Sequence, residues 1–218
     1  MLVNKDPNNM FAVRQLDRYM EGHNGFVCGG CFKNIFNHEK ISDVDIFFAE
    51  EADWAEACER FASDQRYDAA YENKNVKAYR EKETGVVVEL CRKIFGTPTE
   101  MLKQFDFTIT KCSYYKVLVT PLVDGETLLC KKFIEKDEKR EIEYRLLIDD
   151  NFFEHLHFKR LVCDDAIPYP MSTFNRMFKY GRYGYFPCTE TKAKIVKALR
   201  SAREDDIKIV ESFYDGVD

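Results

Sequence analysis

The chain has 218 residues, of which 45% are hydrophobic, so it can build a substantial core as one large or two small domains. That composition excludes a mainly disordered chain, and the formal net charge of −5 argues against a protein that coats duplex DNA through a broad basic surface. There is no window of about 18 apolar residues and no signal-peptide pattern after Met1, so we expect a soluble cytoplasmic protein without membrane contact.

Helices and strands are expected to alternate in the first hundred residues. In chain order the predicted elements are a helix over 7–20, a strand over 25–28, a helix over 31–38, a strand over 41–48, a helix around 54–61, and a hairpin of strands over 76–80 and 86–92. In the strand over 41–48, apolar residues alternate with Asp43 and Asp45. The two carboxylates therefore share the face opposite to the core.

The middle of the chain is predicted to return to the sheet. A capping box at Thr97 with Pro98 predicts a helix that extends to Phe105. A strand is expected to begin near Asp106 and run through Ile109 toward Val119. The expected continuation is a turn at 124–125, a strand at 128–129, and a charged stretch over 131–140 that we interpret as a soft domain boundary.

Helices dominate the predicted C-terminal part. Ser172 can cap a helix that ends at Gly181, a second helix carries Ile195 and Leu199 on one face, and Asp205 can begin a last short helix. We predict an α+β fold with a mixed sheet flanked by helices. Residues 1–130 would form the head and residues 131–218 a mostly helical tail packed on it.

The eight cysteines are expected to be reduced thiols, because no secretion signal precedes them. Cys28 and Cys31 have the spacing of a zinc pair, which His155 and His157 could complete. A second closely spaced cysteine pair is missing, so a zinc site is the minor alternative.

The two glycines between these cysteines point to a different chemistry. Gly29 and Gly30 lie at a strand-to-helix junction, where the absence of side chains lets phosphates approach the backbone. Asp43 and Asp45 follow on the next strand and can hold divalent cations for displacement at phosphorus. Gly-Gly alone also occurs in ordinary turns, and Asp-x-Asp alone occurs on solvent-exposed strand faces. The order of the two motifs along the chain is more informative than either one.

This order, a strand, Gly-Gly, a helix and an Asp-x-Asp strand, resembles the signature of the DNA polymerase β-like nucleotidyltransferase superfamily. The sequence around Gly29 and Gly30 is similar to that of the head domain of poly(A) polymerases and CCA-adding enzymes. The chain departs from them at two positions. Lys33 replaces an arginine and lacks its bidentate guanidinium group, and Asn34 replaces an aspartate and lacks its negative charge. Segments around residues 96–109 and 170–181 are similar to small phage- and virus-encoded nucleotidyltransferases.

The resemblance implies a third carboxylate on a neighbouring strand, and two residues compete for it. Glu89 is a lone acid in an apolar strand, where an ion needs a partner or a metal. Asp106 matches a recurrent Phe-Asp pair of the phage-like relatives. Pairing with a lysine or arginine is the structural alternative for Glu89, and capping is the alternative for Asp106; we favour Asp106.

A basic cluster in the tail is the second candidate contact with the nucleotide. It contains Arg176, Lys179 and Arg182, interleaved with three tyrosines at positions 180, 183 and 185. In CCA-adding relatives a similar helix lies against the cleft, so Arg176 or Lys179 could reach the triphosphate and a tyrosine could stack on the base. Equally, these aromatics could only pack the tail onto the head.

The resemblance thus implies an enzyme that uses Mg2+ or Mn2+ to move a nucleoside monophosphate from an NTP to an acceptor, with release of pyrophosphate. The acceptor could be an RNA 3′ end, a protein hydroxyl or a small molecule. The alternative is a catalytically idle copy that acts as a binding partner in a phage or defence system. Retention of Asp43, Asp45 and a third acid argues against an idle copy.

Overall fold

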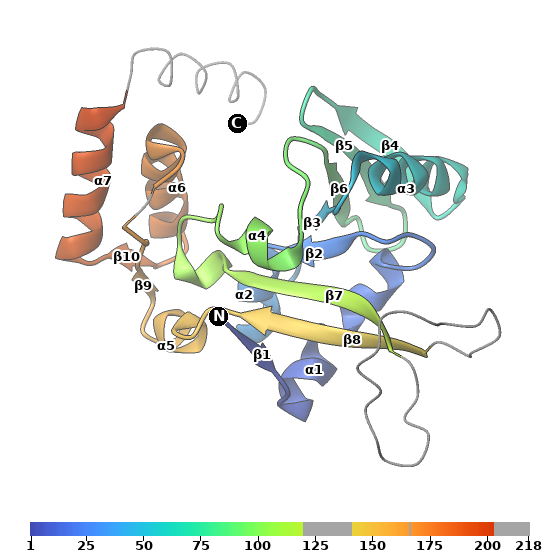
Figure 1. The fold of residues 1–218 in the computed structure, drawn as a ribbon, viewed down its shortest axis with the longest axis horizontal. Helices are drawn as coiled ribbons and strands as arrows, with labels where there is room; N and C mark the ends of the chain where they lie inside the picture. Colours follow the sequence, from blue (N-terminus) through green and yellow to red (C-terminus); the bar gives the residue numbers. More distant parts are fainter. Residues whose placement is uncertain (120–140, 166, 203–218) are drawn as a thin grey trace, which may run out of the picture.

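An eight-stranded mixed sheet forms the centre of the computed structural model, which describes residues 1–119, 141–165 and 167–202 (Figure 1). Its strands are β1 Leu2–Asn4, β2 Phe26–Cys28, β3 Asp43–Phe47, β4 Tyr67–Glu72, β5 Val76–Glu81, β6 Val87–Cys91, β7 Cys112–Val119 and β8 Glu141–Ile148. Their order across the sheet is β1-β8-β7-β2-β3-β6-β5-β4. β3 and β6 run parallel, whereas the other neighbours pair antiparallel.

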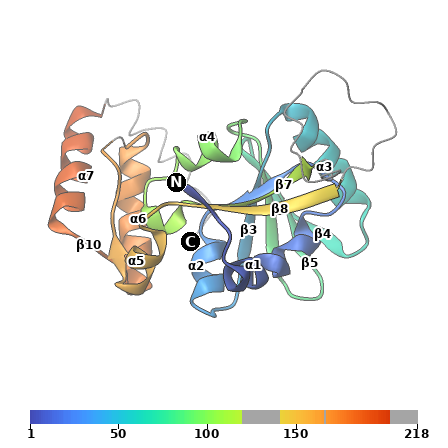
Figure 2. The same cartoon turned by 60° about the horizontal axis from the view of Figure 1, so that its bottom comes forward.

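Helices cover both faces of this sheet and extend beyond one end of it. They are α1 Pro7–Val13, the 3-10 helix η1 Arg14–Tyr19, α2 Cys31–Phe36, α3 Glu51–Ser63, α4 Pro98–Leu102, the 3-10 helix η2 Thr108–Thr110, α5 Phe152–His157, α6 Pro170–Arg182 and α7 Thr189–Ser201. Figure 2 shows α1 and α2 on one face of the sheet, α4 on the other, and α6 and α7 beside it. Two short parallel strands, β9 Arg160–Leu161 and β10 Phe186–Pro187, join the tail to the region of α5. No helix within the described ranges is long and apolar enough to cross a membrane.

Alternation along the central strands divides the interior into two clusters. Val27 and Ile46 point into the main core, where they meet residues of α1, α2 and α3. Phe26 and Cys28 point to the opposite face and pack beneath α4 against Met101. Because successive side chains of a strand point to opposite faces, the acids that alternate with the core residues of β3 lie on the α4 face.

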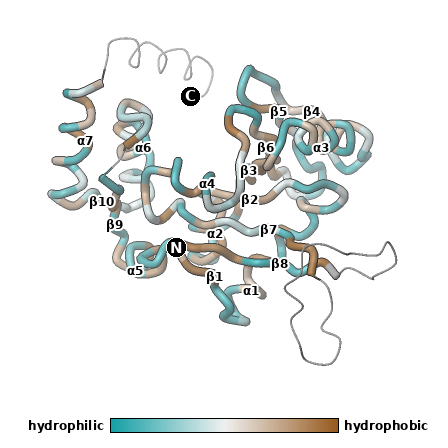
Figure 3. Tube along the Cα trace, in the orientation of Figure 1, coloured by the Kyte–Doolittle hydropathy of each residue, from teal (hydrophilic) through white to brown (hydrophobic). Residues whose placement is uncertain are grey.

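The predicted α+β class, the mixed sheet and the helical tail are confirmed. The Asp6 cap is present, since its carboxylate accepts from the backbone N–H groups of Asn8 and Asn9. The capping box at Thr97 and the β5–β6 hairpin also form as predicted. In Figure 3 the tail helices α6 and α7 alternate between hydrophilic and hydrophobic residues, as helices with one buried side do.

Several predicted elements are wrong in detail. Helix α4 ends at Leu102 and does not extend to Phe105. The first α-helix ends at Val13 and continues as a 3-10 helix. The segment after Asp106 is η2 and not a strand, because side-chain bonds such as Thr110 Oγ1 to the Phe107 carbonyl close a local turn. Helix α6 begins at Pro170, whose fixed φ suits the first helical position, so Ser172 lies inside the helix.

Strands β1, β4 and β8 were not expected from the sequence. β8 pairs with β7 along its whole length, so the sheet continues beyond residue 130, the expected end of the head. The predicted turn at 124–125, the strand at 128–129, the boundary at 131–140 and the helix at Asp205 lie outside the described residues.

Candidate functional site

Three acids, Asp43, Asp45 and Glu89, form what we call the acid cluster. Asp45 lies opposite Cys28 of β2 on one side and opposite Glu89 of β6 on the other. The pairing of β3 with β6 is parallel and regular, so the Asp45 and Glu89 side chains stand on the same face of neighbouring strands. Asp43 is exposed at the start of β3 and accepts a hydrogen bond from the Ser42 hydroxyl.

The electrostatics of the acid cluster are unfavourable in the protein alone. Burial raises the pKa of Asp45 well above its usual value, and the neighbouring Glu89 and Asp43 carboxylates raise it further. The positive charge of Lys179 on α6 lowers the pKa of Asp45. Among the described residues, no ion pair within 4.0 Å involves any of the three acids. Within the described residues, the partly buried Asp45 carboxylate therefore lacks an ion-pair partner.

The glycine turn next to the acid cluster requires glycine at one of its two positions. Gly29 has a φ of +99°, and an added Cβ would lie 3.1 Å from Asp45 Oδ2 and 3.1 Å from the Phe105 ring. Gly30 has ordinary helical dihedrals, with a φ of −70°. A Cβ there would meet only the Tyr180 hydroxyl, at 3.6 Å. Gly29 thus allows the close approach of β2 to Asp45, and Gly30 leaves open space toward the tail.

A cleft of about 240 Å3 lies between this turn and α6. Its lining residues come from α2, β3 and the tail: Gly30, Cys31, Lys33, Asn34, Glu39, Ser42, Asp43, Lys179, Tyr180 and Tyr183. One of the two predicted glycines, both predicted lysines and one predicted acid, Asp43, therefore meet in this cavity, whereas Gly29, Asp45 and Glu89 are not among its lining residues.

Lys33 is held by neighbours within this cleft. Its ammonium group lies 3.1 Å from Glu39 Oε2 and 4.9 Å from the centre of the Tyr183 ring. The residue is buried, although its head group reaches the cleft. Asn34, the other departure from the family pattern, donates from Nδ2 to the Lys40 carbonyl and fixes the turn before β3.

Glu89 and Asp106, the two candidates for the third carboxylate, have different surroundings. Glu89 stands next to Asp45 in the sheet, whereas Asp106 Oδ2 lies 2.8 Å from Arg176 Nη2. Asp106 is 3% exposed, and its other oxygen accepts the Phe107 backbone N–H. Arg176, predicted as a triphosphate contact, is therefore engaged with a head carboxylate across the junction with the tail.

The tail tyrosines divide between packing and the cleft. Tyr180 is buried, lies edge-on to Phe107 at 5.7 Å, and packs α6 against the head. Tyr185 is fully buried and accepts a hydrogen bond from Asn37. Tyr183 is 53% exposed and faces Lys33, so its ring is the one that a nucleotide base could contact.

One contact of the acid cluster was not expected from the sequence. The hydroxyl of Tyr71, on the edge strand β4, donates a hydrogen bond to Glu89 Oε1. No sequence motif marks Tyr71, and β4 itself was not predicted.

The donor set fits magnesium better than zinc. Cys28 and Cys31 are buried, and burial raises the pKa of both thiols, which disfavours the thiolate that zinc requires. The seven described cysteines are unpaired, and His155 is bonded to the Thr108 hydroxyl. No group of three or more His, Cys, Asp or Glu side chains in the described ranges is arranged to hold a metal ion, so the acid cluster is not a preformed cation site. Carboxylates that leave room for waters and substrate phosphates suit Mg2+.

Comparison with known families identifies the chain. Residues 4–159 match the model of the Gabija anti-defense 2 family, which is more than half of the chain. The chain belongs to this family. A search of the curated proteins finds no match.

Solved structures confirm the expected fold. A tRNA nucleotidyltransferase complexed with a primer tRNA and an incoming ATP analogue has a TM-score of 0.50 and 16% identity, over 90% of this chain and 55% of that one. The apo form of a CCA-adding enzyme has a TM-score of 0.50 and 17% identity, over 90% of this chain and 43% of the enzyme. The chain thus shares the polymerase β-like nucleotidyltransferase fold and spans about half the length of these enzymes.

Proposed function

We propose that this member of the Gabija anti-defense 2 family is a metal-dependent nucleotidyltransferase. It would move a nucleoside monophosphate from an NTP to an acceptor and release pyrophosphate. The observation that carries the proposal is the partly buried Asp45 carboxylate, which stands beside Glu89 and Asp43 without an ion-pair partner among the described residues. An idle binding protein would gain nothing from this destabilising arrangement.

Asp43, Asp45 and Glu89 are the residues that would hold Mg2+ or Mn2+ in this proposal. Bound there, the metal would supply the positive charge that the triphosphate and the attacking oxygen require. We assign the third position to Glu89 because it stands in register with Asp45. Asp106 is assigned to holding Arg176, and through it α6, against the head.

Lys33 and Lys179 are the proposed phosphate ligands. Both line the cleft together with Asp43, one from α2 and the other from α6. A triphosphate that enters beside Gly30 would meet both ammonium groups, and Tyr183 offers an exposed ring for the base.

The acceptor is proposed from the family to which the chain belongs. Its description as an anti-defense family suggests that the modified molecule is a component of the Gabija system. Transfer of a nucleoside monophosphate would add a bulky anionic group to that component. A hydroxyl of a protein or the 3′ end of an RNA could receive it.

Label transfer tests the proposal. The protein is incubated with each α-labelled NTP, Mg2+ or Mn2+, purified Gabija proteins and total RNA, and the labelled macromolecule is identified. We expect label from the wild type and none from the Asp43→Asn, Asp45→Asn variant. As a control, Glu56→Gln with Glu59→Gln removes two exposed carboxylates from α3 and should transfer normally. No label with any NTP, or equal label from the aspartate variant, would contradict the proposal.

A further inference from the structure

We propose that Tyr71 is a positioning residue of the acid cluster, which holds the Glu89 carboxylate beside Asp45. The inference rests on the proposed function, since it assigns a role toward the same metal site. Its basis is the hydrogen bond that the Tyr71 hydroxyl donates to Glu89 Oε1. Three features of the sheet make this contact specific.

An irregularity in β4 decides which face of the sheet Tyr71 occupies. Ala69 pairs with Tyr79, but Tyr71 pairs with Ala78, so Ala70 is an extra residue in β4. In an unbroken register Tyr71 would lie opposite Lys77, on the same face as Tyr79. The bulge moves Tyr71 to the other face, and bulges beside active sites commonly redirect a side chain in this way.

The redirected tyrosine joins a continuous row across four strands. Tyr71 pairs with Ala78, Ala78 with Glu89, and Glu89 with Asp45. Tyr71 and Glu89 are two strand spacings, or roughly 10 Å, apart across the sheet, and Ala78 lies between them. Its single methyl group lets the tyrosine ring pass over β5 and reach the carboxylate.

Glu89 needs such a partner because its neighbour repels it. A glutamate side chain beside another acid can rotate away from it, and Glu89 lies directly opposite Asp45 in the sheet. The Tyr71 hydroxyl offers a donor that keeps Glu89 in place before any cation binds. Partners of this kind orient metal ligands, and their loss typically weakens metal affinity 10–100-fold.

Mn2+ calorimetry on the full chain tests the inference without relying on activity. We expect Tyr71→Phe to bind Mn2+ about 10–100-fold more weakly than the wild type. Its melting temperature should stay close to that of the wild type, because Tyr71 is 45% exposed and the ring is kept. Tyr67→Phe is the matched control, since it removes from the same strand a hydroxyl without a hydrogen-bond partner among the described residues. It should leave Mn2+ affinity unchanged.

A double-mutant cycle separates positioning from a general effect on the sheet. In a Glu89→Gln background, Tyr71→Phe should weaken Mn2+ binding no further, because it acts through that carboxylate. Wild-type affinity in Tyr71→Phe, or an equal loss in both backgrounds, would overturn the inference while leaving the proposed function intact. Absence of Mn2+ binding by the wild type would instead overturn the proposed function, and this inference with it.

Discussion

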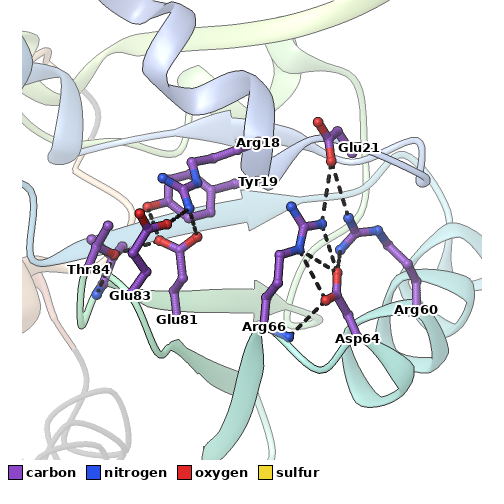
Figure 4. A network of polar contacts seen from close by, with 10 residues as sticks. Arg18, Tyr19, Glu21, Arg60, Asp64, Arg66, Glu81, Glu83 and Thr84 are labelled. Atoms are coloured by element: carbon purple, nitrogen blue, oxygen red, sulfur yellow. Dashed lines mark hydrogen bonds and ion pairs between the residues drawn. The ribbon is translucent and has the colours of Figure 1, made fainter.

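Two groups of carboxylates in this structure have opposite surroundings. Glu81 at the end of β5 is 1% exposed, and Arg18 Nη2 lies 2.5 Å from its Oε1 (Figure 4). The hydroxyls of Tyr19 and Thr84 donate to its other oxygen at 2.9 Å and 2.6 Å. Asp45 on β3 is partly buried, and its neighbours in the sheet include two further acids, Glu89 and Asp43.

The same contrast holds for the directions of the pKa shifts. In the second half of the network in Figure 4, hydrogen bonds from Arg66 lower the pKa of Asp64 to about 2. Burial and acidic neighbours raise that of Asp45 instead. Acids that the fold supplies with arginine and hydroxyl partners stabilise the fold. An acid surrounded by acids weakens the fold unless a cation binds, which is why we assign function to the acid cluster.

The largest expected effect separates the two groups directly. Asp43→Asn combined with Asp45→Asn should abolish nucleotide transfer, since the proposed metal ligands are lost. Without metal, the melting temperature should stay constant or rise, because the repulsion among the acids is removed. Label transfer and thermal unfolding measure the two quantities. An unfolded double variant would place these aspartates with the structural acids.

The pH dependence of stability sharpens this result. Because the pKa of Asp45 is raised, the folded protein holds a proton that the unfolded chain has lost at pH above about 4. The stability of the metal-free wild type should therefore fall as the pH rises from about 4 through the raised pKa of Asp45. Asp45→Asn should lack this part of the slope, as measured by denaturant unfolding across the range. Identical slopes would contradict the electrostatic description of the acid cluster.

The next effect distinguishes the two candidates for the third acid. Glu89→Gln should lower the transfer rate more than about 100-fold, beyond the loss typical of a residue that only orients a ligand. Asp106→Asn should mainly lower the melting temperature, because it weakens the ion pair with Arg176. Steady-state rates and melting curves of both variants check this. A larger rate loss in Asp106→Asn would restore the assignment that the sequence favoured.

Arg176→Ala tests whether the tail arginine belongs to the structural group. It leaves Asp106 buried without its cation, which should reduce the free energy of unfolding by about 3 kcal/mol. NTP affinity, measured by calorimetry at fixed Mg2+, should change less than tenfold. Arg182→Ala, on the same helix, is the control. A strong loss of NTP affinity at unchanged stability would show that Arg176 meets the triphosphate.

The smallest expected effect concerns the arginine-paired acid itself. Glu81→Gln keeps acceptor capacity for Tyr19 and Thr84 but loses the charge that faces Arg18. The free energy of unfolding should fall by about 1.5 kcal/mol, the lower end for a hydrogen bond to a charged group. Transfer should continue at the wild-type rate. A reduced rate in the folded variant would break the distinction between the two groups of acids.

The sequence could predict what depends on local pattern. Alternation placed Asp43 and Asp45 on one face of β3, and the glycine turn before them indicated the polymerase β-like nucleotidyltransferase fold. The third acid could not be chosen in this way, because the choice between Glu89 and Asp106 depends on which strand pairs with β3. The role of Tyr71 could not be predicted from the sequence for a further reason. The bulge at Ala70 reverses the face that alternation along β4 would assign to it.

Crystals soaked with Mn2+ and a non-hydrolysable NTP analogue would test the central claim most directly, because anomalous scattering locates the metal itself. We expect a Mn2+ peak bonded to carboxylate oxygens of Asp43 and Asp45, next to Glu89, with the triphosphate beside Lys33 and Lys179. A fully occupied nucleotide elsewhere, or a nucleotide in the cleft without metal at the acid cluster, would contradict it.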